Sequence, residues 1–349
     1  MFKKHTIKDV AREAGVSIAT VSFVLNNTPG QVISAEVRKK VDAAAKKLDY
    51  HPNAAASGLA RKRTGNISIV FYKRGDLISN QYYSFVIQGA VKEAMRRELN
   101  LMFSYIESDY AKDTRLPKVV RERNTEGAIF IHTVEPQLVK DIESRGIPVV
   151  GVDTYPAMMG LNSVSVDDVQ GGYWAVKHLA ELEHRHLGAV FAAEDRPSIN
   201  GRLRGYREAC NDFHIKLKEC PCASLTFEDG FAGSRKMLSL KRRPTGIVCV
   251  NDEMAAGVIT AAHDLGLKVP EDVSIVGFDN IEMSNYTVPP LTTVGTDKEK
   301  LGERAVQRLM EIIQDQNSPC QQVLLAAELV VRESSGPASR APIRLGQKK

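Results

Sequence analysis

Short polar side chains surround a predicted helix break near the start of the chain, where their chemistry suits contact with phosphate. Residues 6–22 read Thr-Ile-Lys-Asp-Val-Ala-Arg-Glu-Ala-Gly-Val-Ser-Ile-Ala-Thr-Val-Ser, which predicts two short helices interrupted at Gly15, the second capped by Ser17. Hydroxyls and free backbone N–H groups at a helix N-terminus bind phosphate oxygens well. The pattern is typical of a helix-turn-helix, which presents one helix to the DNA major groove.

Three helices are expected to position this surface. Thr6 and Asp9 have the spacing of a capping box, Ser34 opens a third helix, and Tyr50-His-Pro ends it. Apolar residues at helical spacing predict a small shared core, formed by Ile7, Val10, Ala11, Val21, Val24, Leu25, Val37, Val41, Ala44, Ala45 and Leu48. The face that remains for DNA carries Ile18, Ala19, Ser22, Phe23 and Asn26.

The charge distribution supports a nucleic-acid partner for this segment. Residues 1–64 hold 12 Lys and Arg but only 5 Asp and Glu, a net charge of +7, whereas the whole chain carries +5. The remainder therefore has a net charge of −2. A basic excess confined to one segment is expected where that segment faces phosphates.

From residue 66 onward, apolar strand-like runs alternate with amphipathic helix-like segments. The predicted strands are Ile67–Tyr72, Leu101–Ile106, Ala128–His132, Val149–Val152, Ala189–Ala193, Gly246–Val250 and Val273–Phe278, and the predicted helices include Ser84–Arg97, Gly171–Leu182, Arg204–Phe213 and Glu253–Leu265. This alternation predicts an α/β fold with two Rossmann-like lobes, which bind ligands at the carboxyl ends of their parallel strands.

Several function classes find little support in the sequence. No apolar run reaches about 18 residues and the first residues lack a signal-peptide core, so we expect a cytoplasmic protein without a membrane partner. The five cysteines match no common zinc spacing, and His184-Arg-His186 falls between a helix and a strand, so no metal or cofactor is expected. Without G-x-G-x-x-G, P-loop, G-x-S-x-G or H-E-x-x-H motifs, we expect no enzyme.

The sequence resembles the lactose/galactose-repressor (LacI) family of bacterial transcription regulators over residues 5–335. The resemblance is carried by Asp9-Val-Ala, Ala14-Gly-Val-Ser, Thr20-Val-Ser, Tyr50-His-Pro-Asn, Arg202-Leu-Arg-Gly, Asn251-Asp, Ser274-Ile-Val-Gly-Phe-Asp and Pro290-Leu-Thr-Thr. It implies a homodimer with an all-α helix-turn-helix headpiece, a hinge helix and a two-lobe periplasmic-binding-protein-like core of parallel sheets.

The resemblance also implies domain boundaries. The headpiece would span 1–52, the hinge 53–64 and the core 65–335, followed by a disordered basic tail over 336–349. Within the core, one lobe would combine 65–162 with 295–325, and the other 163–294 with 326–335.

The DNA contacts implied by the family motif are Thr6, Ser17, Ile18, Ala19, Thr20, Ser22, Phe23, Asn26, Tyr50, Asn53, Ala56 and Leu59. Phe23 would meet thymine methyl groups, or else pack into the headpiece core. Residues 53–59 would form a hinge helix that folds on DNA, with Leu59 wedged into the minor groove; the alternative is a passive alanine-rich linker.

The implied effector-binding residues are Asp153, Arg202, Phe227, Asn251, Asp252 and Asp279. A guanidinium and carboxylates at strand ends suit a ligand rich in hydroxyls, such as a sugar, although each residue alone is also compatible with a structural ion pair or cap. Tyr82 and Tyr83 would line the cleft or a dimer face.

Together these features predict an effector-controlled transcription regulator. We expect a repressor that binds a palindromic operator. A solute-binding receptor would share the two lobes but would need a signal peptide and no headpiece. The sequence leaves open whether the effector is a sugar, a sugar phosphate, a nucleoside or a phosphoprotein, and whether it weakens or strengthens DNA binding. It also leaves dimer and tetramer open, although the tail lacks a leucine heptad.

Overall fold

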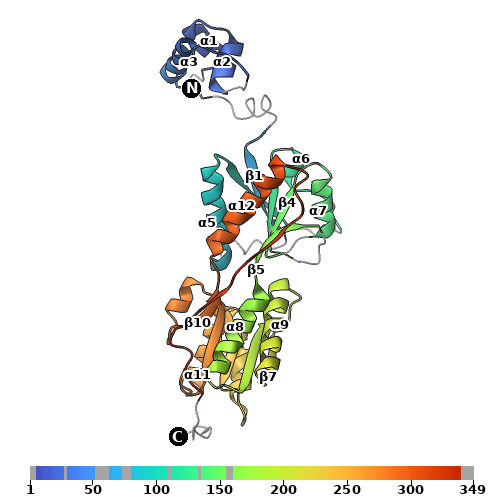
Figure 1. Cartoon of the computed structure of the whole chain (residues 1–349), viewed down its shortest axis with the longest axis vertical. Helices are drawn as coiled ribbons and strands as arrows, with labels where there is room; N and C mark the ends of the chain where they lie inside the picture. Colours follow the sequence, from blue (N-terminus) through green and yellow to red (C-terminus); the bar gives the residue numbers. More distant parts are fainter. Residues whose placement is uncertain are drawn as a thin grey trace. The chain divides into compact units, whose positions relative to one another are not determined.

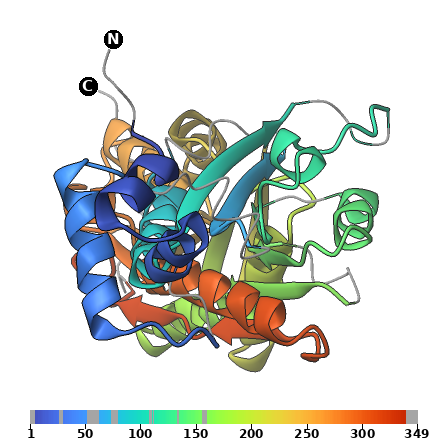
Figure 2. The ribbon, with the colours of Figure 1, turned by 90° about the horizontal axis from the view of Figure 1, so that it is seen from above.

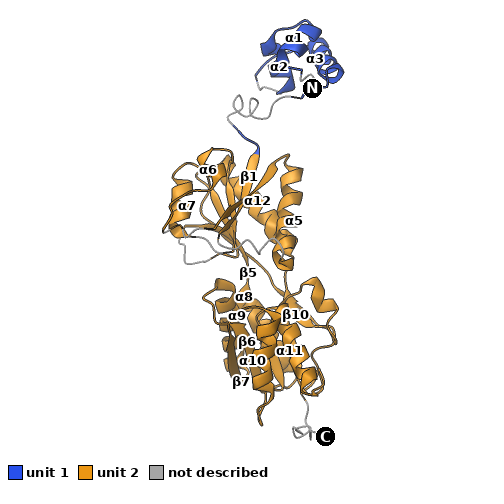
Figure 3. Cartoon of the chain, turned by 180° about the vertical axis from the view of Figure 1, so that it is seen from behind, with its two compact units in different colours: residues 1–65 blue, residues 66–349 orange. Residues whose placement is uncertain are grey.

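The computed structural model describes residues 5–26, 30–51, 63–72, 80–107, 110, 112–132, 135–154 and 160–338. The chain forms two compact units, residues 1–65 and residues 66–349 (Figure 3). The predicted hinge positions Asn53, Ala56 and Leu59 lie outside the described residues, so their roles stay predictions.

The first unit contains three helices, α1 (Ile7–Ala14), α2 (Ile18–Leu25) and α3 (Ala35–Lys47). Gly15 ends α1 with φ 65°, a left-handed conformation that glycine adopts without strain. Val10, Val21 and Val41, one from each helix, are fully buried at the centre of the core. The predicted helix-turn-helix and its core are therefore confirmed.

The first lobe of the second unit is built on a six-stranded sheet of order β11-β5-β4-β3-β1-β2, in which all neighbouring strands run parallel. Its strands are β1 (Asn66–Tyr72), β2 (Asn100–Ile106), β3 (Ala128–Ile131), β4 (Val149–Val152), β5 (Asn162–Val166) and β11 (Gln322–Leu325). Its helices are α5 (Gln81–Arg96), α6 (Lys118–Arg121), α7 (Pro136–Glu143) and α12 (Lys298–Gln314). Helices α5 and α12 pack together on the face opposite α7 (Figures 1 and 2).

The second lobe has a sheet of order β12-β10-β9-β8-β6-β7, parallel except for β12. Its strands are β6 (His186–Ala192), β7 (Lys216–Cys222), β8 (Gly246–Cys249), β9 (Ser274–Asp279), β10 (Thr292–Gly295) and β12 (Glu328–Val330). Its helices are α8 (Asp168–Glu181), α9 (Pro197–Asp212), α10 (Phe227–Leu238), α11 (Asp252–Asp264) and the short 3₁₀ helix Glu282–Asn285. Helix α8 packs on α9, and α10 on α11.

The structure refines the predicted lobe boundaries. Residues 163–166 belong to β5 and therefore to the first sheet, not the second, because β5 pairs with β4 and β11. The chain first passes from one lobe to the other after Val166, the last residue of β5. It returns to the first lobe between Gly295, in β10, and Lys298, at the start of α12, and passes to the second lobe again between β11 and β12.

The predicted start of a disordered tail at Gly336 was too early. The amide of Gly336 donates to the Ser274 hydroxyl (3.0 Å), and the amide of Ala338 donates to the carbonyl of Leu182 (2.8 Å). These bonds hold the chain on the second lobe through residue 338.

Candidate functional site

Short hydroxyl side chains organise the N-termini of the first two helices of the headpiece. The Ser17 hydroxyl accepts a hydrogen bond from the Thr20 amide (3.0 Å) and lies 2.8 Å from the Thr20 hydroxyl. The amide and hydroxyl of Thr6 both donate to the Asp9 carboxylate, at 2.9 and 2.8 Å. The caps predicted at Ser17 and Thr6 are thus present, and they fix the outer ends of α1 and α2.

The predicted DNA face is formed by one side of α2. Ser17, Ile18 and Ala19 are exposed, with Ile18 exposing 45% of its surface, an unusual placement for isoleucine. The rest of this face is half-buried and consists of Thr20, Ser22, Phe23 and Asn26. The side-chain amide of Asn26 donates to the Ser22 hydroxyl (3.2 Å).

Two aromatic residues of this unit differ in their packing. Phe23 is half-buried but lies outside the described residues that form the headpiece core, which favours its availability for DNA. Tyr50, in contrast, packs against that core. Its predicted DNA contact would therefore use only the part of the ring that remains exposed.

A cavity of about 460 Å³ lies between the two lobes, lined by residues at the carboxyl ends of strands from both sheets. Asp153 follows β4, Asn251 follows β8, and Asp279 ends β9. Parallel sheets place ligand-binding groups at this edge. The lining residues are Asn80, Tyr82, Tyr83, Asp153, Glu194, Arg196, Ser198, Ile199, Arg202, Ser224, Leu225, Thr226, Val250, Asn251, Glu253 and Asp279.

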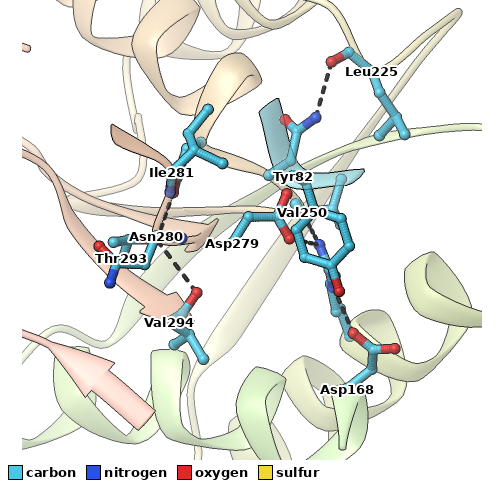
Figure 4. Close-up of polar contacts among 12 residues, drawn as sticks. Tyr82, Asp168, Leu225, Val250, Asp279, Asn280, Ile281, Thr293 and Val294 are labelled. Atoms are coloured by element: carbon cyan, nitrogen blue, oxygen red, sulfur yellow. Dashed lines mark hydrogen bonds and ion pairs between the residues drawn. The ribbon is translucent and has the colours of Figure 1, made fainter. Parts of the chain in front are cut away.

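Arg202, on α9, is the cation at the base of this cavity and is only 7% exposed. Its Nε donates to Asp168 (2.8 Å), its Nη1 lies 3.1 Å from Asp279, and Nη1 also donates to the Val250 carbonyl. The guanidinium stacks over the Phe278 ring, 3.7 Å from its centroid. Figure 4 shows Asp168, Val250 and Asp279 gathered around this point.

Burial and mutual repulsion raise the pKa values of the carboxyl groups here. Burial, followed by the charge of Asp168, raises the pKa of Asp153 to about 7. Burial raises the pKa of Asp168 to about 6, although Arg202 opposes this. Burial alone would lower the pKa of Arg202, but Asp279 and Asp168 hold it above its ordinary value. The site thus combines an arginine that stays positively charged with carboxyl groups whose pKa values lie near 7.

Four of the six predicted effector residues line the cavity: Asp153, Arg202, Asn251 and Asp279. Asn251 also caps α11, since its Oδ1 accepts from the Met254 amide (2.8 Å) while its Nδ2 donates to the Leu225 carbonyl (2.9 Å). That second bond, visible in Figure 4, ties the cap to another part of the cavity wall.

The other two predicted effector residues lie elsewhere. Asp252 is fully buried behind the cavity, where it accepts hydrogen bonds from the Thr293 hydroxyl and the Ile281 amide. Because Ile281 lies just beyond β9 and Thr293 lies in β10, these bonds hold the side chain toward those strands, and Asp252 is absent from the cavity lining. Phe227, at the start of α10, is 36% exposed and is absent from the lining.

Sequence reasoning missed Asp168, which binds Arg202, and the pair Glu194 and Arg196, which lines the cavity. The available signal for Asp168 was the Asp-Asp pair before an amphipathic helix. Asp167 caps this helix, and Asp168 binds Arg202 of the neighbouring helix. The structure places Tyr82 and Tyr83 in the cavity wall, the first of the two positions predicted for them.

His184 has a structural role in the second lobe. Its ring nitrogens lie 2.9 Å from the Thr245 hydroxyl and 3.0 Å from the Gly336 carbonyl. Within the described ranges no group of His, Cys, Asp or Glu has the arrangement of a metal site. In that same part of the chain, no helix is long and apolar enough to cross a bilayer.

Asp252 should give the stability of the core a measurable pH dependence. Burial, followed by the charge of Asp279, raises its pKa from an ordinary 3.8 to about 8. The folded state then retains a proton that the unfolded state releases, so this contribution to stability is lost as pH rises from about 4 toward 8.

The test is the free energy of unfolding of wild type and Asp252→Asn between pH 5 and 7. The wild-type protein should lose about 1.4 kcal/mol more per pH unit than the variant, which cannot titrate at this position. Parallel pH profiles would show that Asp252 is ionised in the folded protein.

Comparison with known proteins agrees with both units. Residues 6–53 match the family described as "Bacterial regulatory proteins, lacI family", and residues 176–335 match "Periplasmic binding protein-like domain". The chain is 32% identical over 334 residues to the HTH-type transcriptional repressor PurR of Klebsiella pneumoniae, covering 94% of this chain and 96% of that one.

Two solved structures share the architecture. The lac repressor dimer bound to operator and the anti-inducer ONPF superposes with a TM-score of 0.82 at 28% identity, covering 96% of this chain and all of that one. A LacI family transcriptional regulator of Enterococcus faecalis V583 with bound ribose gives a TM-score of 0.67 at 26% identity, covering 78% and 99%.

The helix-turn-helix headpiece, the cavity between two parallel-sheet lobes and the likeness along nearly the whole chain lead to one conclusion. This protein belongs to the lacI family of bacterial regulatory proteins and is a DNA-binding transcriptional repressor with a ligand-binding core.

Proposed function

We propose that this chain acts in the cytoplasm as a homodimer on a palindromic operator, and that a neutral sugar bound in the cavity controls its affinity for DNA. The observation that carries the proposal is the position of the cavity, which takes its lining from both lobes. A ligand held there binds one arrangement of the lobes better than another, and only such a difference shifts a conformational equilibrium.

The charges in the cavity favour a neutral ligand. Four carboxyl groups line it, on Asp153, Glu194, Glu253 and Asp279, against the two cations of Arg196 and Arg202. Both cations are already paired, Arg196 with Glu194 and Arg202 with Asp279 and Asp168. A phosphate group would therefore find no free cation in the described lining to balance its charge.

The remaining lining groups suit a polyhydroxylated ring. Tyr82 and Tyr83 provide aromatic surface, and carboxylates and amides accept or donate hydrogen bonds to hydroxyl groups. The relative solved with bound ribose supports a sugar as the ligand class.

Thermal unfolding of the full-length protein with a panel of sugars tests the ligand class. Neutral sugars, ribose among them, are compared with their phosphate esters and with nucleosides. A true ligand at 100 times its Kd should raise the free energy of unfolding by about 2.7 kcal/mol, and its phosphate ester should have a much smaller effect. A larger effect of a phosphate ester or a nucleoside would contradict the proposal.

The predicted hinge over residues 53–59 leads to a separate expectation. Ala54-Ala-Ala and Gly58 form a segment too short to be a stable helix alone, so it should become helical when the dimer binds its operator. Circular dichroism of the full-length protein should show increased helix content on addition of operator duplex but not of random duplex. An unchanged spectrum would favour the passive linker.

A further inference from the structure

Two cysteines lie on one face of the edge strand β7 in the second lobe. Cys220 and Cys222 alternate with Pro221, so both side chains point to the same side of the sheet. A Cβ atom added to Gly233 of α10 would lie 2.6 Å from the Cys222 sulfur and 3.2 Å from the Cys220 sulfur. The two sulfur atoms therefore converge on one point, which the glycine leaves free, and both residues are only half-buried.

The two thiols differ in acidity because they interact with each other. The Cys222 thiol donates to the backbone carbonyl of Cys220 (3.7 Å), and its interaction with the Cys220 thiol lowers the pKa of Cys220. The nearby Lys218 and Lys236 lower this pKa further, against the effect of burial. The same interaction, followed by burial, raises the pKa of Cys222. If the pair reacts, the more acidic Cys220 is the thiol expected to act as nucleophile, and Cys222 the one expected to resolve the intermediate.

We propose that Cys220 and Cys222 form a reversible disulfide on exposure to a peroxide, and that this bond alters the wall of the effector cavity. With hydrogen peroxide, the Cys220 thiolate attacks one peroxide oxygen and the O–O bond breaks. Cys220 becomes a sulfenic acid, and the hydroxide that leaves takes up a proton to give water. Cys222 then attacks the sulfenic sulfur and displaces a second water. The two sulfurs lose two electrons in all, and the peroxide gains them.

Geometry explains why the bond would be reversible and why it would move the strand. Residues two apart in an extended strand have Cα atoms about 6.6–6.8 Å apart, whereas disulfides favour about 5.5–6 Å. Closing the bond thus contracts β7 at Cys220–Cys222. An edge strand can bend in this way, because in the sheet order only β6 pairs with β7. Strained disulfides are the more readily reduced ones.

The contraction would reach the cavity along the chain. The Cys222 carbonyl accepts the amide of Ala193 (2.8 Å), the residue that follows β6, and Glu194 comes next. On the other side of Cys222, Ser224, Leu225 and Thr226 line the cavity. Oxidation should therefore disturb the cavity wall at Glu194 and at residues 224–226. The effect of oxidation on ligand binding rests on the proposed function, but its effect on the bond between Ala193 and Cys222 does not.

Mass spectrometry of the full-length protein treated with hydrogen peroxide tests the bond itself. Trypsin releases residues 219–235 as one peptide with these two cysteines and no others. After treatment and blocking of free thiols, this peptide should remain unblocked and be lighter than the unblocked dithiol peptide by two hydrogen atoms. Dithiothreitol should reverse the change. Cys220→Ser should abolish it, whereas Cys320→Ser, at an exposed position, should not.

Amide hydrogen exchange tests the consequence without any effector. Two amides are the probes: that of Ala193, bonded to the Cys222 carbonyl, and that of Ser224, which donates to the Asp229 carboxylate (2.6 Å). Their exchange should accelerate by at least about tenfold in the oxidised protein and return on reduction, as expected when these bonds open. Recovery of Cys220 as sulfinic acid, or of both thiols unmodified, would overturn the proposed disulfide. A disulfide with unchanged exchange at these amides would overturn the link to the cavity.

Discussion

Arg202→Ala should abolish the response to the effector while leaving the affinity for DNA in the absence of effector within about threefold of wild type. Arg202 holds Asp168 and Asp279 in place from the base of the cavity, so its loss removes a ligand-facing cation and releases two carboxyl groups at once. Truncating one partner of a buried, hydrogen-bonded charge network costs about 2–5 kcal/mol of binding, which is at least 30-fold in Kd. The headpiece is a separate compact unit and retains its own core.

The measurement is the effector titration of DNA binding, made with the sugar that stabilises the wild-type protein in thermal unfolding. Arg207→Ala is the matched control, because Arg207 lies on the same helix α9 but its side chain is 55% exposed and pairs with Glu219. The control should respond like wild type. An undiminished response of the Arg202 variant would remove Arg202 from the binding site.

Gly302→Leu should unfold or severely destabilise the core, because this glycine allows helices α5 and α12 to touch through their backbones. A Cβ atom at Gly302 would lie 1.9 Å from the Val86 carbonyl oxygen, and one at Gly89, on the facing helix, 1.8 Å from the Glu299 carbonyl oxygen. Neither backbone can move aside without separating the helices. Overpacking of a core typically costs about 1–3 kcal/mol and occasionally more, and we expect a cost at or above the top of this range because the clash is with backbone atoms.

Chemical denaturation of the full-length protein measures this effect. Lys300→Leu introduces the same side chain on the exposed face of α12 two residues earlier and should change stability by no more than about 0.5 kcal/mol. Equal stability of the two variants would show that the close approach of α5 and α12 does not contribute to the fold.

The headpiece was predictable almost residue by residue because its signals are local. Gly15, the caps at Thr6 and Ser17, and the apolar positions of three short helices each act within one turn of helix. The central strands of the core were also predictable from local sequence, because their continuous apolar runs reflect burial on both faces of the sheet.

The edges of the sheets and part of the site were not predictable in this way. Strand β7 contains lysines and a proline, and β11 and β12 are short and partly exposed, so neither period nor hydrophobicity reveals them. Asp252 was predicted to bind the effector from the family motif, yet it is bonded to Thr293 and Ile281, which lie far along the chain. The partners in such long-range pairings are not evident from the local sequence: the Asp-Asp pair marks Asp168 at the start of α8, but nothing nearby indicates that it binds Arg202.

The headpiece is expected to recognise a two-fold-symmetric duplex under the control of a ligand in the core. The direct measurement is equilibrium binding of the full-length protein, at physiological salt, to a duplex selected from random sequences, with and without the stabilising sugar. We expect a palindromic site bound at least about 1,000-fold more tightly than random duplex, and an affinity that changes at least about fivefold with the sugar. Equal affinity for selected and random duplexes, whatever sugar is present, would contradict the account.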